Sequence, residues 1–194
     1  MVYVSFCTKG IYQKIINTYL IPSLKKFNLN YDIDCFENKG SWIDNIQYKP
    51  LFIKKALLKH KCPIISLDAD ATIEKKPTLF QSLKNYDIAI HYLDWKTWYG
   101  HGNKKELLGG TMYFNYNKKV LNLIEKWIKE QEKSKQFAQR VFQKLLENEK
   151  DLKIYNLPLE YCYIKTRPGN KSPLIKLDPI ILQHQTSRKY KKGE

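Results

Sequence analysis

The feature that most constrains this chain is a short apolar segment that ends at two acidic residues. Residues 62–67 are mostly apolar and are β-branched at Ile64 and Ile65, as expected of a buried strand in a parallel sheet. Asp68 and Asp70 follow at once, with one residue between them. Ligands of open α/β sheets bind beyond the carboxyl ends of the strands, so we expect both carboxylates at that edge of the sheet.

The spacing of the two acidic residues predicts a cation site. In an extended chain, residues i and i+2 face the same side, so Asp68 and Asp70 should converge. Two close carboxylates repel each other unless a cation lies between them. Carboxylates and diphosphate oxygens form the hard ligand set that Mg²⁺ and Mn²⁺ prefer. The alternative is an ordinary acidic turn after a strand, because a bare D-x-D also occurs by chance.

Strands and helices alternate along the chain. We expect strands at residues 2–7, 31–36, 62–67, 87–91 and 111–115, shorter ones near 152–155, 161–164 and 180–183, and helices at 11–27, 50–60, 77–83, 118–133 and 136–147. Pro22 should kink or divide the first helix. The alternation is typical of βαβ units with a mainly parallel central sheet flanked by helices. The predicted fold class is therefore α/β, with a single domain over residues 1–190 and a basic, frayed tail at residues 191–194.

One stretch between the predicted strands looks different. Residues 92–107 are polar and contain Trp95, Trp98, Gly100 and Gly102. We expect a mobile active-site loop there rather than part of the core.

The net charge is the strongest bias in the composition. Lysine and arginine number 34 against 19 acidic residues, which gives a formal net charge of +15. Such a charge attracts polyanions, namely nucleic acid, anionic membrane surfaces or phosphorylated small molecules. Most of the cations are lysine, and the chain is also rich in isoleucine and asparagine, so an AT-rich coding sequence would produce the same bias. The charge is therefore either functional or merely compositional.

The sequence also suggests a cellular compartment. No stretch approaches the roughly 18 apolar residues of a membrane span. The N-terminal residues lack a basic leader and a small-residue cleavage site. The four cysteines are far apart and form no C-x-x-C pair, so we expect reduced thiols in a cytoplasmic protein.

Several short blocks, taken in order, resemble the nucleotide-diphospho-sugar transferase family, which has a GT-A fold. The blocks are residues 48–57, His60, Cys62-Pro63, 67–70, 87–91, 110–115, Leu157-Pro158 and 181–188. They span roughly residues 2–190, and their ordered combination is more specific than any one of them. The resemblance implies a metal-dependent glycosyltransferase that moves a sugar from a nucleotide-diphosphate donor, a UDP- or GDP-sugar, to a hydroxyl acceptor.

The resemblance also implies a metal centre. Asp68 and Asp70 match the family's D-x-D motif, which holds Mn²⁺ or Mg²⁺ and, through the metal, the donor diphosphate. His184 matches a late histidine that completes the metal shell in related enzymes. A packed or surface histidine is the alternative for that position.

Further residues are assigned to the donor by the same resemblance: Ser5, Thr8, Lys49, Asp68, Gly110, Thr111, Asn115, Gln139 and Arg188. Ser5 and Thr8 would flank the base and ribose, and Lys49 would contact a phosphate or the sugar. Gly110 and Thr111 would line the sugar pocket, where glycine lets the backbone approach a ligand closely. Asn115 would contact the sugar or merely cap the next helix, and Arg188 would pair with phosphate bidentately.

The chain departs from the family in one place. Members often carry Asp-Gln at the start of the penultimate helix, where this sequence has Ala138-Gln139. That aspartate commonly faces the sugar or the acceptor. Asp94, in the aromatic segment, is our candidate for the catalytic carboxylate in its place.

The acceptor is less constrained than the donor. A glycan acceptor is our first prediction. The charge and the aromatic segment are also compatible with transfer to hydroxymethylated bases of DNA, with a flipped base as substrate. A non-catalytic nucleic-acid-binding α/β protein is the alternative of another class, and it would make the D-x-D motif accidental. Inversion or retention at the anomeric carbon, and the oligomeric state, stay open.

Overall fold

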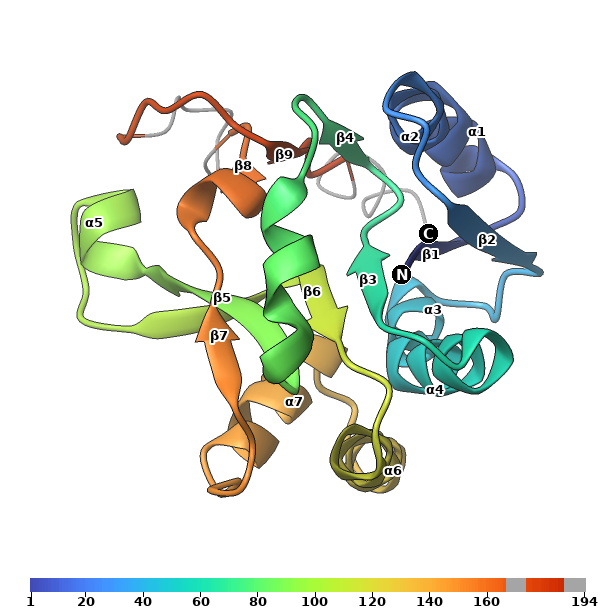
Figure 1. Ribbon diagram of the computed structural model, residues 1–194, viewed down its shortest axis with the longest axis vertical. Helices are drawn as coiled ribbons and strands as arrows, with labels where there is room; N and C mark the ends of the chain where they lie inside the picture. The colour runs from blue at the N-terminus through green and yellow to red at the C-terminus, as the bar shows by residue number, and fades with distance from the viewer. Residues whose placement is uncertain (167–173, 187–194) are drawn as a thin grey trace.

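The main sheet of the protein has six strands. The computed structural model describes residues 1–166 and 174–186, and the sheet order is β2-β1-β3-β6-β5-β7. The strands are β1 (Val2–Thr8), β2 (Tyr31–Phe36), β3 (Ile64–Leu67), β5 (Ile88–Asp94), β6 (Lys105–Phe114) and β7 (Ile154–Asn156). Only β6 runs antiparallel to its neighbours, β3 and β5, whereas the other pairs are parallel. The predicted α/β class with a mainly parallel sheet is confirmed (Figure 1).

A second, three-stranded sheet lies beside the end of β3. Its order is β4-β9-β8, with β4 (Ala71–Ile73) antiparallel to β9 (Ile181–Gln183) and β8 (Tyr163–Ile164) parallel to β9. The strand β4 was not predicted. It starts directly after Asp70, so the acidic motif forms the turn between the two sheets.

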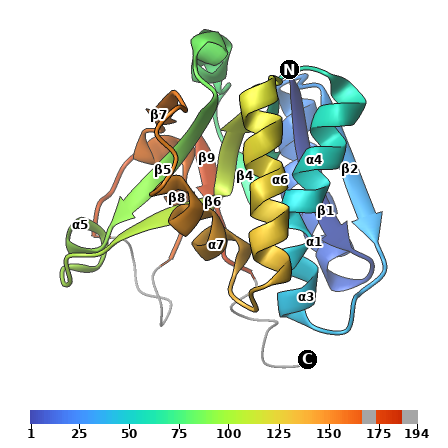
Figure 2. The ribbon, with the colours of Figure 1, turned by 90° about the horizontal axis from the view of Figure 1, so that it is seen from below.

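Helices cover both faces of the main sheet. They are α1 (Ile11–Thr18), α2 (Leu20–Lys26), α3 (Trp42–Gln47), α4 (Lys49–His60), α5 (Trp95–Tyr99), α6 (Lys118–Glu132) and α7 (Ala138–Leu146), with 3₁₀ segments η1 (Thr78–Asn85) and η2 (Leu159–Tyr161). Figure 2 shows α4, α6 and α7 together over one face. None of the helices in the described part of the chain is long and apolar enough to cross a membrane.

The period-two alternation of the strands builds a separate core on each face. Ile64 packs in the cluster beneath α4, α6 and α7, whereas the next residue, Ile65, packs in the cluster beneath α1, α2 and η1. Phe114 likewise packs in the first cluster and Tyr113 in the second. Because successive side chains point to opposite faces, a strand buried on both faces must be apolar throughout.

Two local features differ from the prediction. The first helix divides at Tyr19, between α1 and α2, and Pro22 lies in the first turn of α2, where its missing N–H is tolerated. The helix α3 was not predicted, although Ser41 accepts a hydrogen bond from the Asp44 N–H at 3.1 Å, a capping pattern visible in the sequence.

The segment expected to be a mobile loop, residues 92–107, is ordered. Strands β5 and β6 pair antiparallel from Tyr92–Leu107 to Asp94–Lys105. The short helix α5 connects them, and Trp98 is only 1% exposed because it packs against Leu93 and Tyr163. Tertiary burial of one aromatic ring therefore overrides the polar composition of this segment.

Two of the cysteines are not free thiols. Cys7 and Cys35 are register partners in the parallel pair β1–β2, their Cα atoms lie 4.8 Å apart, and they form a disulfide. Cys62 and Cys162 are free. The prediction of four reduced thiols is wrong for the first pair, because a separation of 28 residues conceals the register that brings them together.

Candidate functional site

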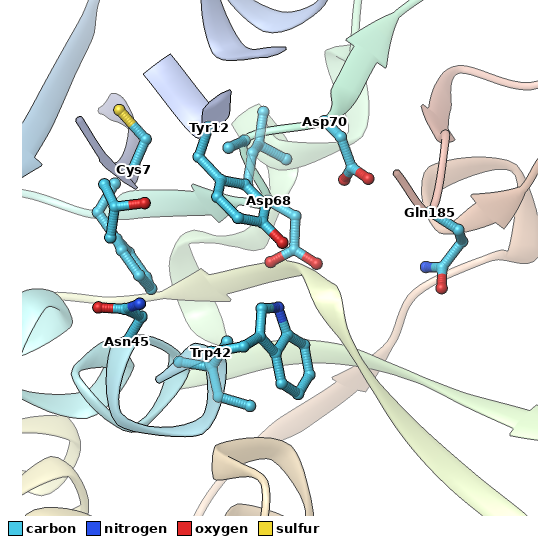
Figure 3. Close-up of a pocket in the computed structure, with 12 residues that line it drawn as sticks. Cys7, Tyr12, Trp42, Asn45, Asp68, Asp70 and Gln185 are labelled. Carbon is cyan, nitrogen blue, oxygen red and sulfur yellow. The ribbon is translucent and has the colours of Figure 1, made fainter. Parts of the chain in front are cut away.

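Asp68 and Asp70 occupy the turn between β3 and β4. The Asp68 N–H donates to the Gly110 carbonyl at 2.9 Å, and the Ala71 N–H donates to the Asp68 carbonyl at 3.0 Å. Both carboxylates line one cavity at the carboxyl end of the parallel strands (Figure 3). This is the edge at which α/β sheets bind ligands.

The two carboxylates differ in their surroundings. Asp70 Oδ2 accepts hydrogen bonds from Thr186, from its N–H at 2.6 Å and from its hydroxyl at 2.9 Å. Burial raises the pKa of Asp70, and the neighbouring charge of Asp68 raises it further. Repulsion between two carboxylates that share a cavity is the condition that a divalent cation relieves. The pair therefore fits such a cation.

Lys49 ties the acidic turn to the rest of the site. It is the first residue of α4, and it is only 8% exposed. Its ammonium donates to Asp68 Oδ1 at 2.7 Å and to the Gly109 carbonyl at 2.7 Å. One buried cation therefore joins α4, the end of β3 and β6.

The first cavity is mostly apolar with acidic residues at one end. It is lined by Phe6, Cys7, Thr8, Tyr12, Trp42, Asn45, Ile46, Leu67, Asp68, Ala69, Asp70 and Gln185. Figure 3 shows the rings of Tyr12 and Trp42 on either side of the space that Asp68 faces. Flat aromatic walls beside a pair of carboxylates that could hold a cation suit a ligand with a planar ring and phosphates.

A second, more polar cavity adjoins the first. It is lined by Asp68, Leu93, Tyr99, Glu106, Leu108, Gly109, Gly110, Gln139, Cys162, Ile164, Gln183 and Gln185. Asp68 and Gln185 line both cavities. A ligand that extends from one cavity into the other must therefore pass the acidic turn.

Glycine at position 110 allows two strands to approach closely. A Cβ on Gly110 would lie 2.8 Å from Gln183 Cδ. The Gln183 amide donates to the Gly110 carbonyl and to the Thr111 hydroxyl, each at 3.1 Å. The glycine thus lets β9 close the wall of the second cavity.

Some predicted donor residues lie within the walls. The Ser5 hydroxyl donates to the Leu67 carbonyl at 2.7 Å, and Thr111 is fully buried beneath Gln183. Thr8, Gly110 and Gln139 do line the cavities. Contact with the donor stays a prediction for all five residues, and for Ser5 and Thr111 this arrangement supports a structural role.

Asn115 is not brought to the site. Its amide donates to the carbonyls of Lys84 and Tyr86 at 3.0 and 3.1 Å. Because β6 runs antiparallel, Asn115 follows its end at the opposite edge of the sheet from Asp68. A sugar contact by Asn115 stays a prediction that this arrangement does not support.

His184 does not face the acidic pair either. Its Nε2 lies 2.9 Å from the Thr72 hydroxyl, and its ring stacks on Tyr19 with 4.2 Å between the centroids. Burial lowers the pKa of His184 to about 4, with a smaller contribution from the charge of Lys165. Metal ligation by His184 stays a prediction that this side-chain arrangement does not support. Arg188 lies outside the described residues.

The carboxylate nominated for catalysis lies elsewhere. Asp94 caps α5 by accepting a hydrogen bond from the Thr97 N–H at 2.9 Å, and it lines neither cavity. Glu106 lines the second cavity and was missed. The signal was present in the alternation of Glu106, Leu108 and Gly110, but it became informative only once the direction of β6 was known.

The fold matches that of solved GT-A-type glycosyltransferases. A solved glycosyltransferase involved in glycosylation of the major capsid of PBCV-1 superposes with a TM-score of 0.65 and 14% identity, covering 98% of this chain and 96% of that one. Mouse xyloside xylosyltransferase 1 gives 0.57 and 11% over 95% and 98%. The galactosyltransferase LgtC gives 0.54 and 8% over 95% and 87%.

The sequence agrees with the fold. The model of the nucleotide-diphospho-sugar transferase family matches residues 30–193, and this chain belongs to that family. It is therefore an enzyme that transfers sugar from a nucleotide-sugar donor. No curated protein matches the chain significantly.

Proposed function

We propose that the protein is a metal-dependent glycosyltransferase that moves a sugar from a UDP- or GDP-sugar to a hydroxyl of a glycan. The observation that carries the proposal is the position of Asp68, which lines both the aromatic cavity and the polar cavity. In a nucleotide-sugar, the diphosphate joins a planar base to a hydroxylated sugar. The two cavities match these two ends, and the acidic turn lies between them.

The donor would bind with its base between Tyr12 and Trp42 and its diphosphate at Asp68 and Asp70. These carboxylates would hold Mn²⁺ or Mg²⁺, and diphosphate oxygens and water would complete the shell. The described residues contain no cluster of three or more acidic, histidine or cysteine side chains arranged for a metal. An open site of this kind suits a cation that binds together with its substrate.

In the reaction, the bond between the anomeric carbon and the diphosphate breaks, and the acceptor oxygen bonds to that carbon while its proton passes to the leaving diphosphate or to water. A cation held by Asp68 and Asp70 would neutralise charge on the leaving diphosphate. Lys49 holds Asp68 and the Gly109 carbonyl at 2.7 Å each, so it fixes the turn against β6. Because these groups are already fixed, the site needs little rearrangement as the transition state forms.

A saccharide acceptor has structural support. Tyr99 borders the polar cavity, and its ring lies in the aromatic segment with Trp95 at 5.3 Å between centroids. Aromatic faces of this kind pack against the apolar face of a sugar. Transfer to modified DNA has the net charge of +15 and the same aromatic segment in its favour.

Calorimetric titration tests the donor site. We expect UDP or GDP to bind in the presence of Mn²⁺ and to bind roughly tenfold or more weakly without it. Asp70→Asn should remove this metal-dependent gain, whereas Asp178→Asn, an exposed carboxylate paired with Lys75, should not. If no nucleotide of a full panel binds in a metal-dependent way, the proposal fails.

Transfer assays test the acceptor. Label from the donor that binds best should appear on an oligosaccharide. Label that appears only on hydroxymethylated DNA would replace the glycan proposal by the DNA alternative.

A further inference from the structure

The polar cavity contains a carboxylate that pairs with no cation among the described residues. Glu106 is the second residue of β6 and lines the cavity that also contains Asp68 and Gln139. It takes part in none of the ion pairs among the described residues. A half-buried acid without a cation is unusual in a chain of net charge +15, so its position calls for a ligand.

Two neutral donors fix the orientation of this carboxylate. Trp95 Nε1–H donates to Glu106 Oε2 at 2.9 Å, and Gln139 Nε2–H donates to Glu106 Oε1 at 3.3 Å. Each carboxylate oxygen has two acceptor positions, so each oxygen keeps one for a ligand. The side chain is therefore held in place while part of its accepting capacity stays available.

Among the described residues, Asp68 is the one other acid that lines the polar cavity. Ala138, at the start of α7, is only 3% exposed and packs in the core, and Asp94 caps α5. Among the residues that line the polar cavity, Glu106 and Asp68 are the two acids. Asp68 already pairs with Lys49 at 2.7 Å, so Glu106 is the acid left for the sugar.

We propose that Glu106 is the sugar-binding carboxylate of this enzyme and selects a neutral, hydroxyl-rich sugar. It accepts hydrogen bonds from the sugar hydroxyls and places a negative charge near the anomeric carbon. That carbon gains positive charge as its bond to the diphosphate breaks, so a fixed anion stabilises the transition state more than the ground state. The amides of Gln139, Gln183 and Gln185 provide neutral partners around it.

The same carboxylate excludes acidic sugars. A uronic acid in the polar cavity would bring a second unpaired negative charge beside that of Glu106, and the described lining residues include no cation to offset it. Repulsion between unpaired charges in a partly desolvated cavity is a strong element of specificity. A neutral hexose or pentose is therefore the expected donor sugar.

This inference rests on the proposed donor site, and Glu106→Gln tests it. The substitution keeps the shape and an oxygen for the Trp95 N–H but removes the charge. With Mn²⁺ present, affinity for the nucleoside diphosphate should change less than about twofold. The turnover number for the neutral nucleotide-sugar should fall roughly 100-fold or more. The ratio of affinities for neutral and uronic nucleotide-sugars should become smaller. The control Glu125→Gln, at an exposed position of α6, should behave as wild type.

Trp95→Phe provides an independent variant. It keeps the charge but removes the N–H that orients the carboxylate at 2.9 Å, so it should lower turnover less than Glu106→Gln and leave diphosphate binding unchanged. If wild type binds and uses a nucleotide-sugar while both variants keep full turnover and the same donor preference, the role of Glu106 is rejected and the donor site stands. If wild type binds no nucleotide with metal, both proposals fall.

Discussion

The Lys49 ammonium lies 2.7 Å from Asp68 Oδ1 and, at the same distance, from the Gly109 carbonyl oxygen. A lysine that the family resemblance assigned to a phosphate or sugar of the donor thus points at the protein's own acidic turn. The contact explains how the end of β3 stays in register with the glycine-bearing part of β6. Because Lys49 pairs with Asp68, the negative charge of Asp70 is the less compensated of the two.

Lys49→Met should weaken both the fold and the site. Removal of the ammonium leaves the Gly109 carbonyl without a donor and frees Asp68, at a cost of about 1–3 kcal/mol in the free energy of unfolding. Urea denaturation measures the cost, and titration with nucleotide and Mn²⁺ measures the site. Lys54→Met, on the same helix but in an exposed pair with Glu125, should change stability by less than about 0.5 kcal/mol. Equal effects of both variants would contradict the buried role of Lys49.

Gly110→Ala should displace the Gln183 side chain. The new Cβ would lie 2.8 Å from Gln183 Cδ, and the side chain is held by two hydrogen bonds. We expect a loss of about 1–3 kcal/mol. In a Gln183→Ala background the same change should cost less, because the clashing atoms are gone, and a double-mutant cycle measures that difference. Strict additivity would show that the two positions are not in contact.

The stacked rings of Trp127 in α6 and Phe142 in α7 should contribute most to the stability of the core beneath these two helices. Trp127 is fully buried, stacks on Phe142 with 4.1 Å between centroids, and donates to the Ala138 carbonyl at 3.1 Å. Trp127→Ala should cost about 3–5 kcal/mol in unfolding free energy. Trp127→Phe should cost less because it keeps most of the volume. Chemical denaturation followed by circular dichroism measures both, and equal losses would mean that packing of the ring is not the cause.

His91 should make the protein less stable in mild acid. Burial lowers its pKa against the smaller opposing effects of the Leu157 carbonyl, 2.6 Å from Nδ1, and of Glu160. A histidine with a lowered folded pKa contributes its full stability above its unfolded pKa of about 6.5. That contribution is lost as the pH falls toward the folded pKa. His91→Asn keeps a donor for the carbonyl, so its melting temperature should fall less than that of wild type between pH 7 and pH 5.

The cysteine pairing has a direct chemical test. Titration of thiols in denaturant should find two groups, Cys62 and Cys162, without reductant and four after reduction. Reduction should also lower the unfolding free energy by about 2–4 kcal/mol. A Cys7→Ser, Cys35→Ser variant should be insensitive to reductant, and four thiols in the untreated protein would exclude the disulfide.

Much of the fold followed from local patterns. The strand Val2–Thr8 and the helix Lys118–Glu132 lie within one residue of their predicted bounds, because a buried strand and an amphipathic helix each have a short-range apolar period. The regular structure of residues 92–107 could not be predicted from local patterns, because Trp98 is buried by residues that are distant in the sequence.

The candidate site also combines features that the sequence predicts with features that only the tertiary structure reveals. The sequence determined that Asp68 and Asp70 end a buried strand two residues apart, and this local geometry suffices to direct both into one cavity. Only the tertiary structure decided what joins them. The reversed direction of β6 carries Asn115 to the far edge of the sheet, brings Gly110 to the acidic turn and places Glu106 in the polar cavity that Asp68 also lines. Strand direction depends on long-range pairing, which no local pattern in the sequence encodes.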